Sequence, residues 1–489
     1  MVEARYNYEI EGYMSHHKQF YIDGSWVEPI STHDFNVIDP SNEEAFATIS
    51  FGTKADVNKA VIAAKRAFQA FRFATRAERI ELLEAVFAVY KKRGRDLGLA
   101  VSREMGAPLQ FALDAQVGIG AAHLKKMIAI LKTYPFEFNK GSALIAKEPV
   151  GVVGMITPWN WPLNQITCKV APALAAGCTM VLKPSEVTPL DAIIFAEIMD
   201  EAGVPPGVFN LVNGNGQDVG QALASHPDVD MMSFTGSTQA GVLIAKAAAD
   251  TVKRVQQELG GKSANILFPD VDFDQAVTKG VAGCYINSGQ ACNAPTRMFV
   301  PVDRQTEAIA IAKREAETYV VGPANAADTT MGPVASQAQY DKIQMLIESG
   351  IKEGATLVTG GLGRPAGLKQ GYYVKPTVFA NVTPEMRIAR EEIFGPVLSI
   401  LSYETPEQAI ALAEDTRYGL AAYIQTRDLV YARRVARQLR TGNVYINYPA
   451  WDVGIAFGGY KQSGNGRECA EFGLEDYLEI KGILGYEVA

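Results

Sequence analysis

From residue 150 onward, short apolar runs alternate with segments whose apolar residues recur at helical spacing. The runs cover residues 152–156, 180–182, 209–212 and 231–234, and a helical segment follows each of them. Such alternation predicts a parallel, doubly wound α/β sheet. Nucleotides bind these sheets at the carboxyl ends of the strands, so we expect a nucleotide site directly after the runs.

The flanking regions predict further elements. An Asp-Gly pair within residues 21–26 predicts a hairpin. A second α/β region is expected after Gly261 and extends to about residue 448, opening with a strand at 266–268 and a helix at 274–285. Amphipathic helices are expected at residues 55–71, 77–90 and 109–131.

The composition fits a folded protein of more than one domain. The chain of 489 residues is too long for one ordinary core, and 48% hydrophobic with 20% charged residues is typical of a globular protein. A net charge of −8 disfavours nucleic acid and anionic membrane surfaces as partners. The apolar runs are far shorter than the roughly 20 residues that a membrane-spanning helix requires.

Cysteine and histidine usage narrows the chemistry. The five cysteines are odd in number and form no CxxC pair, which fits free thiols in a reducing compartment. Residues 1–24 lack the apolar core of a signal peptide, so we expect a cytoplasmic protein. The five histidines form no HExxH or clustered set, so neither a metal site nor a Cys–His hydrolase dyad is expected.

Three residues could together perform acyl transfer. Cys292 could act as a nucleophile, which requires the thiolate form. Glu258, followed by two glycines, could serve as a general base, and the amide NH2 of Asn160 could hold an oxyanion. Taken alone, Glu258 fits a solvated glutamate at a strand end better than a general base, and Asn160 before Pro162 favours a turn.

Seven motifs, in order along nearly the whole chain, resemble those of the NAD(P)-dependent aldehyde dehydrogenase family. They are Pro158-Trp159-Asn160, Lys183-Pro184-Ser185-Glu186, Phe234-Thr235-Gly236-Ser237-Thr238, Glu258-Leu259-Gly260-Gly261-Lys262, Gly289-Gln290-Ala291-Cys292, Glu391-Glu392-Ile393-Phe394-Gly395-Pro396 and Phe457-Gly458-Gly459-Tyr460-Lys461.

The resemblance implies a mechanism. Cys292 would attack an aldehyde, and Asn160 with the backbone N–H of Cys292 would hold the oxyanion of the thiohemiacetal. Transfer of a hydride from the tetrahedral carbon to the nicotinamide of the cofactor would give a thioester. Water activated by Glu258 would then hydrolyse this thioester to the carboxylic acid. Two alternatives stay open: a CoA-acylating aldehyde dehydrogenase, whose members usually lack a glutamate where Glu258 stands, and a non-catalytic structural member of the fold.

The resemblance also implies a dinucleotide site. Lys183 and Glu186 would bind the adenosine ribose, and a carboxylate there repels a 2′-phosphate, so NAD is expected rather than NADP. Glu392 would hold the nicotinamide ribose, with Phe394 packed near the nicotinamide, although Phe394 also fits a core position. The cofactor-binding residues expected are Ile156, Thr157, Pro158, Trp159, Lys183, Ser185, Glu186, Gly216, Gly220, Phe234, Thr235, Gly236, Ser237, Glu258, Leu259, Gly260, Glu392 and Phe394.

The family's pocket positions correspond here to Trp161, Gln165, Cys168, Ala291, Asn293, Trp451 and Phe457. These aromatic and amide side chains favour a medium-sized aldehyde, aromatic or not, that also carries a polar group. No basic residue is present to anchor a carboxylate, and no Asp or Glu to favour a cationic aldehyde.

The expected architecture is an α/β, aldehyde dehydrogenase-like fold with three parts. Residues 1–132 and 150–260 would form the NAD-binding domain, and 261–450 the catalytic domain. Residues 133–149 and 475–489 would form oligomerisation strands, because their β-favouring segments lack a partner nearby in the sequence. An unpaired edge invites aggregation, so these strands are expected to pair between subunits in a homodimer or homotetramer.

Overall fold

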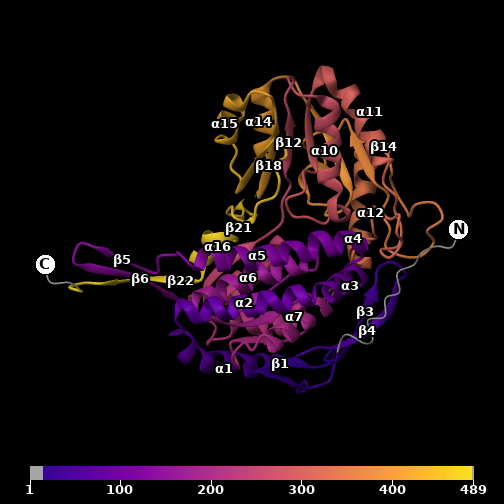
Figure 1. The fold of residues 1–489 in the computed structure, drawn as a ribbon. Helices are drawn as coiled ribbons and strands as arrows, with labels where there is room; N and C mark the ends of the chain where they lie inside the picture. Colours follow the sequence, from indigo (N-terminus) through magenta and orange to yellow (C-terminus); the bar gives the residue numbers. More distant parts are fainter. Residues whose placement is uncertain (1–14, 487–489) are drawn as a thin grey trace.

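The computed structural model describes residues 15–486 in three parts: two α/β domains and a projecting β-arm (Figure 1). Residues 1–14 of the expected NAD-binding domain and 487–489 of the expected oligomerisation segment lie outside the described residues. Within the described range, no helix is long and apolar enough to cross a membrane.

The first domain is built on an eight-stranded sheet in the order β2-β1-β9-β8-β7-β10-β11-β21. Its five central strands are parallel and fully or largely buried, as strands covered by helices on both faces must be. These strands are β7 (Val152–Ile156), β8 (Thr179–Lys183), β9 (Phe209–Leu211), β10 (Met231–Thr235) and β11 (Arg254–Glu258). The expectation of a parallel, doubly wound sheet is confirmed.

The edges of this sheet are antiparallel. The expected hairpin is present as β1 (Phe20–Ile22) and β2 (Ser25–Val27), with Asp23 in the left-handed conformation that the Asp-Gly turn requires. At the opposite edge, β21 (Gly464–Asn465) pairs with β11. The segment after residue 450 therefore returns to the first domain.

Helices cover the sheet at the expected positions. Two of them begin with capping boxes: Thr53 with Asp56 opens α1 and Thr75 with Glu78 opens α2. The covering helices are α1 (Lys54–Phe71), α2 (Arg76–Lys92), α6 (Pro162–Ala176), α7 (Leu190–Glu201), α8 (Gln221–Ser225) and α9 (Thr238–Ala249).

Among residues 54–131, one helix was not predicted and one expected helix is irregular. The unpredicted helix is α3 (Gly94–Met105), which ends at left-handed Gly106. The expected helix at 109–131 consists of α4 (Leu109–Phe111), a π-helical turn and α5 (Val117–Leu131).

The second domain carries a seven-stranded sheet in the order β14-β15-β16-β13-β12-β18-β19, parallel except for β14. Its strands are β12 (Ala264–Leu267), β13 (Arg297–Pro301), β14 (Thr356–Thr359), β15 (Thr377–Ala380), β16 (Val397–Tyr403), β18 (Ala421–Gln425) and β19 (Asn443–Ile446). Its main helices are α10 (Phe273–Tyr285), α11 (Gln305–Ala316), α12 (Gln337–Lys352), α14 (Pro406–Glu414) and α15 (Leu429–Ala436).

The arm is a three-stranded antiparallel sheet that extends away from the body (Figure 1). It contains β5 (Glu137–Lys140), β6 (Ala143–Pro149) and β22 (Leu478–Ile483). The expectation that the segment at β6 lacks a partner nearby in the sequence was wrong, because β5 pairs with it across a short turn. From the far end of the chain, β22 pairs with β6 along its whole length. Both outer strands, β5 and β22, are largely exposed.

Candidate active site

Cys292 lies in a loop between α10 and β13 that turns sharply. Asn287 and Ser288 are both left-handed, with φ of 55° and 57°, and Gly289 follows at 74°. This conformation is unfavourable for non-glycine residues, so the surroundings must hold the loop in place. Cys292 is partly exposed, whereas the four other cysteines are buried. Of the five cysteines, Cys292 is therefore the one most accessible to a ligand.

Asn160 holds this loop from the first domain. Its Nδ2 donates to the carbonyl oxygen of Gln290 at 3.0 Å, and its own carbonyl accepts from Asn287 Nδ2 at 2.8 Å. An amide carries two N–H donors, so one remains for another acceptor. The simple turn interpretation of Asn160 is therefore insufficient, because its side chain contacts the nucleophile loop.

Glu258 ends β11 and is 1% exposed, so the solvated-strand interpretation was wrong. Neither carboxylate oxygen has a hydrogen-bond partner among the described residues. Burial, and then the charge of Glu468, raise the pKa of Glu258 well above its usual range, while Lys169 and Arg467 act in the opposite direction. A carboxyl group with a raised pKa is suited to proton transfer near neutral pH.

Two glycines let the backbone pack closely against Glu258 and against the loop that carries Cys292. A Cβ on Gly458 would lie 2.6 Å from Glu258 Oε1, and one on Gly261 would lie 2.5 Å from the carbonyl oxygen of Cys292. Any larger residue would displace the base or the nucleophile loop.

Burial also raises the pKa of the Cys292 thiol, and the carboxylates of Glu258, Glu392 and Glu468 raise it further. The chain's own residues therefore favour the neutral thiol at rest. Ionisation requires a proton acceptor or a positive charge brought into the site.

Many of the expected cofactor residues lie at or directly after the carboxyl ends of β7, β8 and β10. The Thr157 N–H donates to the carbonyl of Lys183 at 3.2 Å. The buried Lys183 Nζ donates to the Pro184 carbonyl at 2.7 Å and pairs with Glu186 at 3.4 Å. Burial lowers the pKa of Lys183, and Glu186 opposes this.

Features at the same edge fit a dinucleotide. Ser237 caps α9 by accepting from the Ala240 N–H at 3.2 Å, and the first turn of a helix favours phosphate. The hydroxyl of Thr235 is buried without a partner among the described residues, and a Cβ on Gly216 would meet open space. A helix N-terminus and an available hydroxyl would suit a phosphate group.

The second domain contributes two further expected cofactor residues, Glu392 and Phe394. Glu392 accepts from the Gly261 N–H at 2.9 Å, directly after Gly260. Phe394 is left-handed (φ 60°), only partly buried, and packs edge-on against Trp159 with ring centroids 5.4 Å apart. Phe394 is therefore not a core residue.

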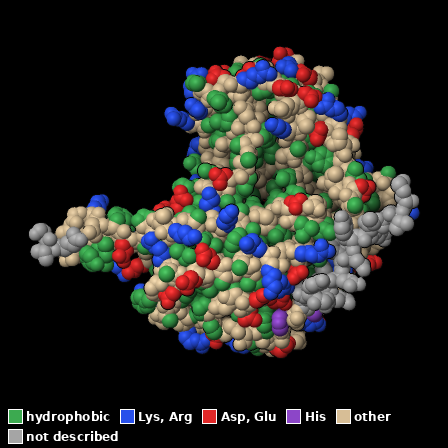
Figure 2. Space-filling model, viewed as in Figure 1, with side chains coloured by type: hydrophobic (Ala, Val, Ile, Leu, Met, Phe, Trp, Pro, Cys, Tyr) green, Lys and Arg blue, Asp and Glu red, His purple; other side chains and the backbone are tan. Residues whose placement is uncertain are grey.

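A cavity of about 610 Å³ opens beside Cys292, and Figure 2 shows the surface hollowed between the two domains. Six of the seven expected pocket residues line it; Cys168 does not. The six are Trp161, Gln165, Ala291, Asn293, Trp451 and Phe457.

Cys168 lies behind the cavity wall. It is 3% exposed, and its Sγ contacts Glu468 Oε2 at 3.3 Å. Glu468 in turn forms a buried ion pair with Lys169. Cys168 was expected in the lining because it corresponds to one of the family's pocket positions, but on α6 (Pro162–Ala176) it is buried and does not reach the cavity.

Several lining residues were not predicted. Glu468 and Asp452 line the cavity, so the expectation of a lining without acidic residues was wrong. Asn164 and Cys469 also line it, as do small residues of the helical segment around Gly118. Glu468 and Cys469 come from a distant part of the chain, and no local motif marks them.

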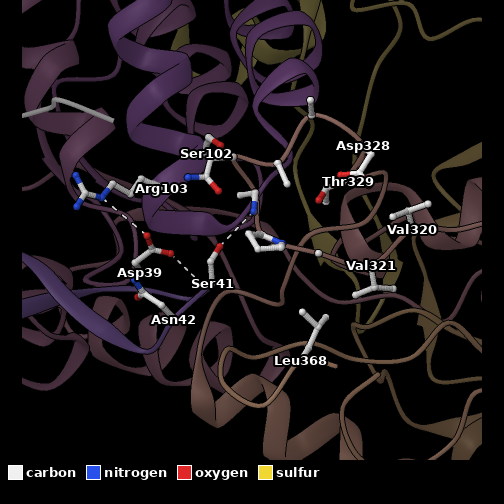
Figure 3. Close-up of a pocket in the computed structure, with 16 residues that line it drawn as sticks. Asp39, Ser41, Asn42, Ser102, Arg103, Val320, Val321, Asp328, Thr329 and Leu368 are labelled. Carbon is white, nitrogen blue, oxygen red and sulfur yellow. Dashed lines mark hydrogen bonds and ion pairs between the residues drawn. The ribbon is translucent and has the colours of Figure 1, made fainter. Parts of the chain in front are cut away.

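A second cavity, of about 590 Å³, lies between the two domains on another side (Figure 3). Asp39 and Arg103 line it from the first domain, and the loop containing Asp328 and Thr329 from the second. Its lining holds no cysteine or histidine and none of the expected site residues. The chemistry therefore belongs to the cavity beside Cys292.

Among residues 15–486, no group of three or more His, Cys, Asp or Glu side chains could hold a metal ion. The groups described above are those of covalent and acid–base catalysis.

Comparison with known proteins identifies the family. The family model described as "Aldehyde dehydrogenase family" matches residues 26–483. A 3-succinoylsemialdehyde-pyridine dehydrogenase from a Pseudomonas species is 52% identical over 97% of this chain and 100% of its own length.

Solved structures agree. A cysteine-to-alanine mutant of aldehyde dehydrogenase C from Pseudomonas syringae, in complex with NAD+ and octanal, superposes with a TM-score of 0.96 at 51% identity, covering 97% of this chain and 98% of that one. Betaine aldehyde dehydrogenase from Staphylococcus aureus with NAD+ gives 0.95 at 38% identity, covering 99% and 97%. The chain belongs to the aldehyde dehydrogenase family.

Proposed function

We propose that the protein oxidises an aldehyde to the carboxylic acid with NAD as cofactor, through a thioester on Cys292. The observation that carries this proposal is a partly exposed thiol in the cavity wall, on a loop to which the Asn160 amide is hydrogen-bonded, with the buried Glu258 carboxyl group near enough to raise the pKa of that thiol.

The chain's residues would act in sequence. The Cys292 thiolate adds to the carbonyl carbon, and Asn160 Nδ2 with the Cys292 N–H holds the oxyanion. NAD, when bound, supplies the hydride acceptor and a positively charged ring. Glu258 then takes a proton from the water that attacks the thioester, and the acid leaves.

The proposed cofactor residues are those at the strand ends and on the second domain. Lys183 and Glu186 would hold the adenosine ribose, α9 and the Thr235 hydroxyl the phosphates, and Glu392 the nicotinamide ribose. The carboxylate of Glu186 favours NAD over NADP by repelling a 2′-phosphate. Neighbouring structures that contain NAD+ support the assignment.

The cavity supports a medium-sized aldehyde. About 610 Å³ lies in the range of sites for small organic ligands, and much of the lining is aromatic or aliphatic. Two relatives are associated with aldehydes of medium size. One solved structure contains octanal, and one relative is named for a pyridine semialdehyde.

The test is NADH formation by the purified protein with an aldehyde panel, with and without CoA. We expect turnover without CoA. A strict requirement for CoA would replace this proposal with the CoA-acylating alternative, and no NADH with any aldehyde would favour a non-catalytic role.

A further inference from the structure

His123 and Asn164 form a pair beside the substrate cavity. Asn164 lies in the first turn of α6 and lines the cavity, whereas His123 lies on α5 and is 5% exposed. The His123 ring Nε2 lies 2.7 Å from Asn164 Oδ1. The bond therefore links a side chain in the cavity wall to a buried ring behind it.

Oδ1 of the Asn164 amide, rather than Nδ2, faces the His123 ring. A hydrogen must lie between the two atoms, and an amide oxygen carries none, so Nε2–H of His123 donates. Burial lowers the pKa of His123, against the opposing effects of Asn164 and Glu468, so the ring is neutral at physiological pH. With Oδ1 engaged, Asn164 Nδ2 is the group left over, and it has no hydrogen-bond partner among residues 15–486.

The charges around the cavity decide what Nδ2 can bind. No Lys or Arg lines the cavity, so a carboxylate on the substrate would find no counter-charge. Both acidic lining residues already have cationic partners: Glu468 pairs with Lys169, and Asp452 lies 4.0 Å from Lys126 Nζ. An N–H donor in such a wall favours a neutral acceptor.

We propose that Asn164 determines substrate specificity by donating a hydrogen bond from Nδ2 to a neutral acceptor on the substrate, away from the aldehyde group. Suitable acceptors are a ketone oxygen, an ether oxygen or a ring nitrogen. His123 is the positioning residue that holds the amide in the donating orientation. This inference rests on the proposed function, because it names the substrate class of the same cavity.

The first experiment compares octanal with the oxo-octanals, each of which carries one ketone along the chain. At least one isomer should have a higher kcat/KM than octanal with the unmodified enzyme. In Asn164→Leu, which keeps the size but removes the donor, the ratio of that isomer over octanal should fall roughly 5- to 30-fold. No preferred isomer with the unmodified enzyme would overturn the inference.

The chain offers a matched control. Asn58 on α1 makes the same kind of contact with His226, with Oδ1 3.2 Å from the ring Nε2, away from the cavity. Asn58→Leu should leave the oxo-octanal ratio unchanged. If Asn164→Leu does not fold, as judged by thermal melting, Asn164→Ala takes its place.

The role of His123 needs a readout that a purely structural role would not move. In His123→Leu the freed Asn164 amide can turn over and present Oδ1, so the preference for the favoured oxo-octanal over octanal should collapse while kcat/KM for octanal changes little. His123→Gln, which can donate from its own amide, should restore most of it. Equal losses for octanal and all its derivatives would show that the pair only supports the fold, and would overturn the inference.

The outcomes separate this inference from the proposed function. If every variant forms NADH from octanal and the oxo-octanal to octanal ratio of kcat/KM is unchanged, only the proposed role of Asn164 is refuted. Absence of NADH from every aldehyde with the unmodified enzyme would sink the proposed function as well.

Discussion

Replacing Glu258 with Gln separates the two halves of the proposed reaction. Glutamine keeps the shape of the side chain at the end of β11 but cannot take a proton from water. General bases typically contribute about 100- to 10,000-fold to a rate. Glu258 is 1% exposed and neither of its oxygens has a hydrogen-bond partner among the described residues, so the carboxylate is free to accept a proton. We expect kcat to fall by about this factor.

Rapid mixing of enzyme, NAD and aldehyde shows which half is lost. If Glu258 serves mainly to hydrolyse the thioester, Glu258→Gln should give a burst of about one NADH per active site, followed by slow turnover. If it mainly takes the proton of Cys292, the burst itself should disappear. Unchanged rates in both phases would refute any catalytic role for Glu258.

The same variant tests the raised pKa of Glu258 through stability. A carboxyl group whose pKa is raised on folding contributes stability that is fully present below its unfolded pKa of about 4.3 and is lost as pH rises through the folded value. A difference of one pH unit between the folded and unfolded pKa corresponds to about 1.4 kcal/mol. Glu258→Gln is neutral throughout, so its Tm relative to wild type should rise from acidic to alkaline pH. A Tm difference independent of pH would contradict the burial argument.

Three further predictions concern the oxyanion, the cofactor and the arm. Asn160→Ala should lower kcat roughly 100- to 1,000-fold with NAD affinity little changed, and a loss below about tenfold would place the oxyanion elsewhere. Glu186→Ser should raise kcat/KM with NADP relative to NAD, whereas equal use of both cofactors by the unmodified enzyme would contradict the role of Glu186. Deleting the residues after Glu475 removes β22 and uncovers β6, so a smaller or less soluble species is expected. Light scattering that shows a stable 52.9 kDa monomer for the full chain would contradict the proposed oligomer.

The sequence predicted the nucleotide-binding half of the fold well because its signals are local. Buried parallel strands are short apolar runs, and capping residues mark the helix starts near Thr53 and Thr75. The motifs containing Lys183 and Gly236 follow such strands directly, so their meeting at one sheet edge follows from topology alone.

The rest of the site depends on contacts that no local pattern reveals. Glu468, which lines the cavity, pairs with the buried Lys169 across 299 residues of sequence. Asn164 and His123 belong to different helices, so their bond depends on how those helices pack. Cys168 was predicted on a helix, correctly, but also in the cavity lining, which was wrong. Packing decides which side of α6 faces the cavity, and the sequence does not show it.

The arm illustrates a third limit. Its strands were expected to pair between subunits because no partner was evident nearby in the sequence, yet β22 pairs with β6 of the same chain. Pairing across such a separation leaves no trace in the hydrophobic pattern of either segment. The exposed outer strands are what now support association between subunits.

The central claim is that the substrate becomes a thioester on Cys292. Glu258→Gln enzyme, quenched after the NADH burst and digested, should show by mass spectrometry an acyl group of the substrate's mass on the peptide containing Cys292. Cys292→Ala should form neither the adduct nor NADH while still binding NAD, and Cys284→Ala should behave as wild type. An acyl group on any other residue, or near-normal NADH production by Cys292→Ala, would contradict the account.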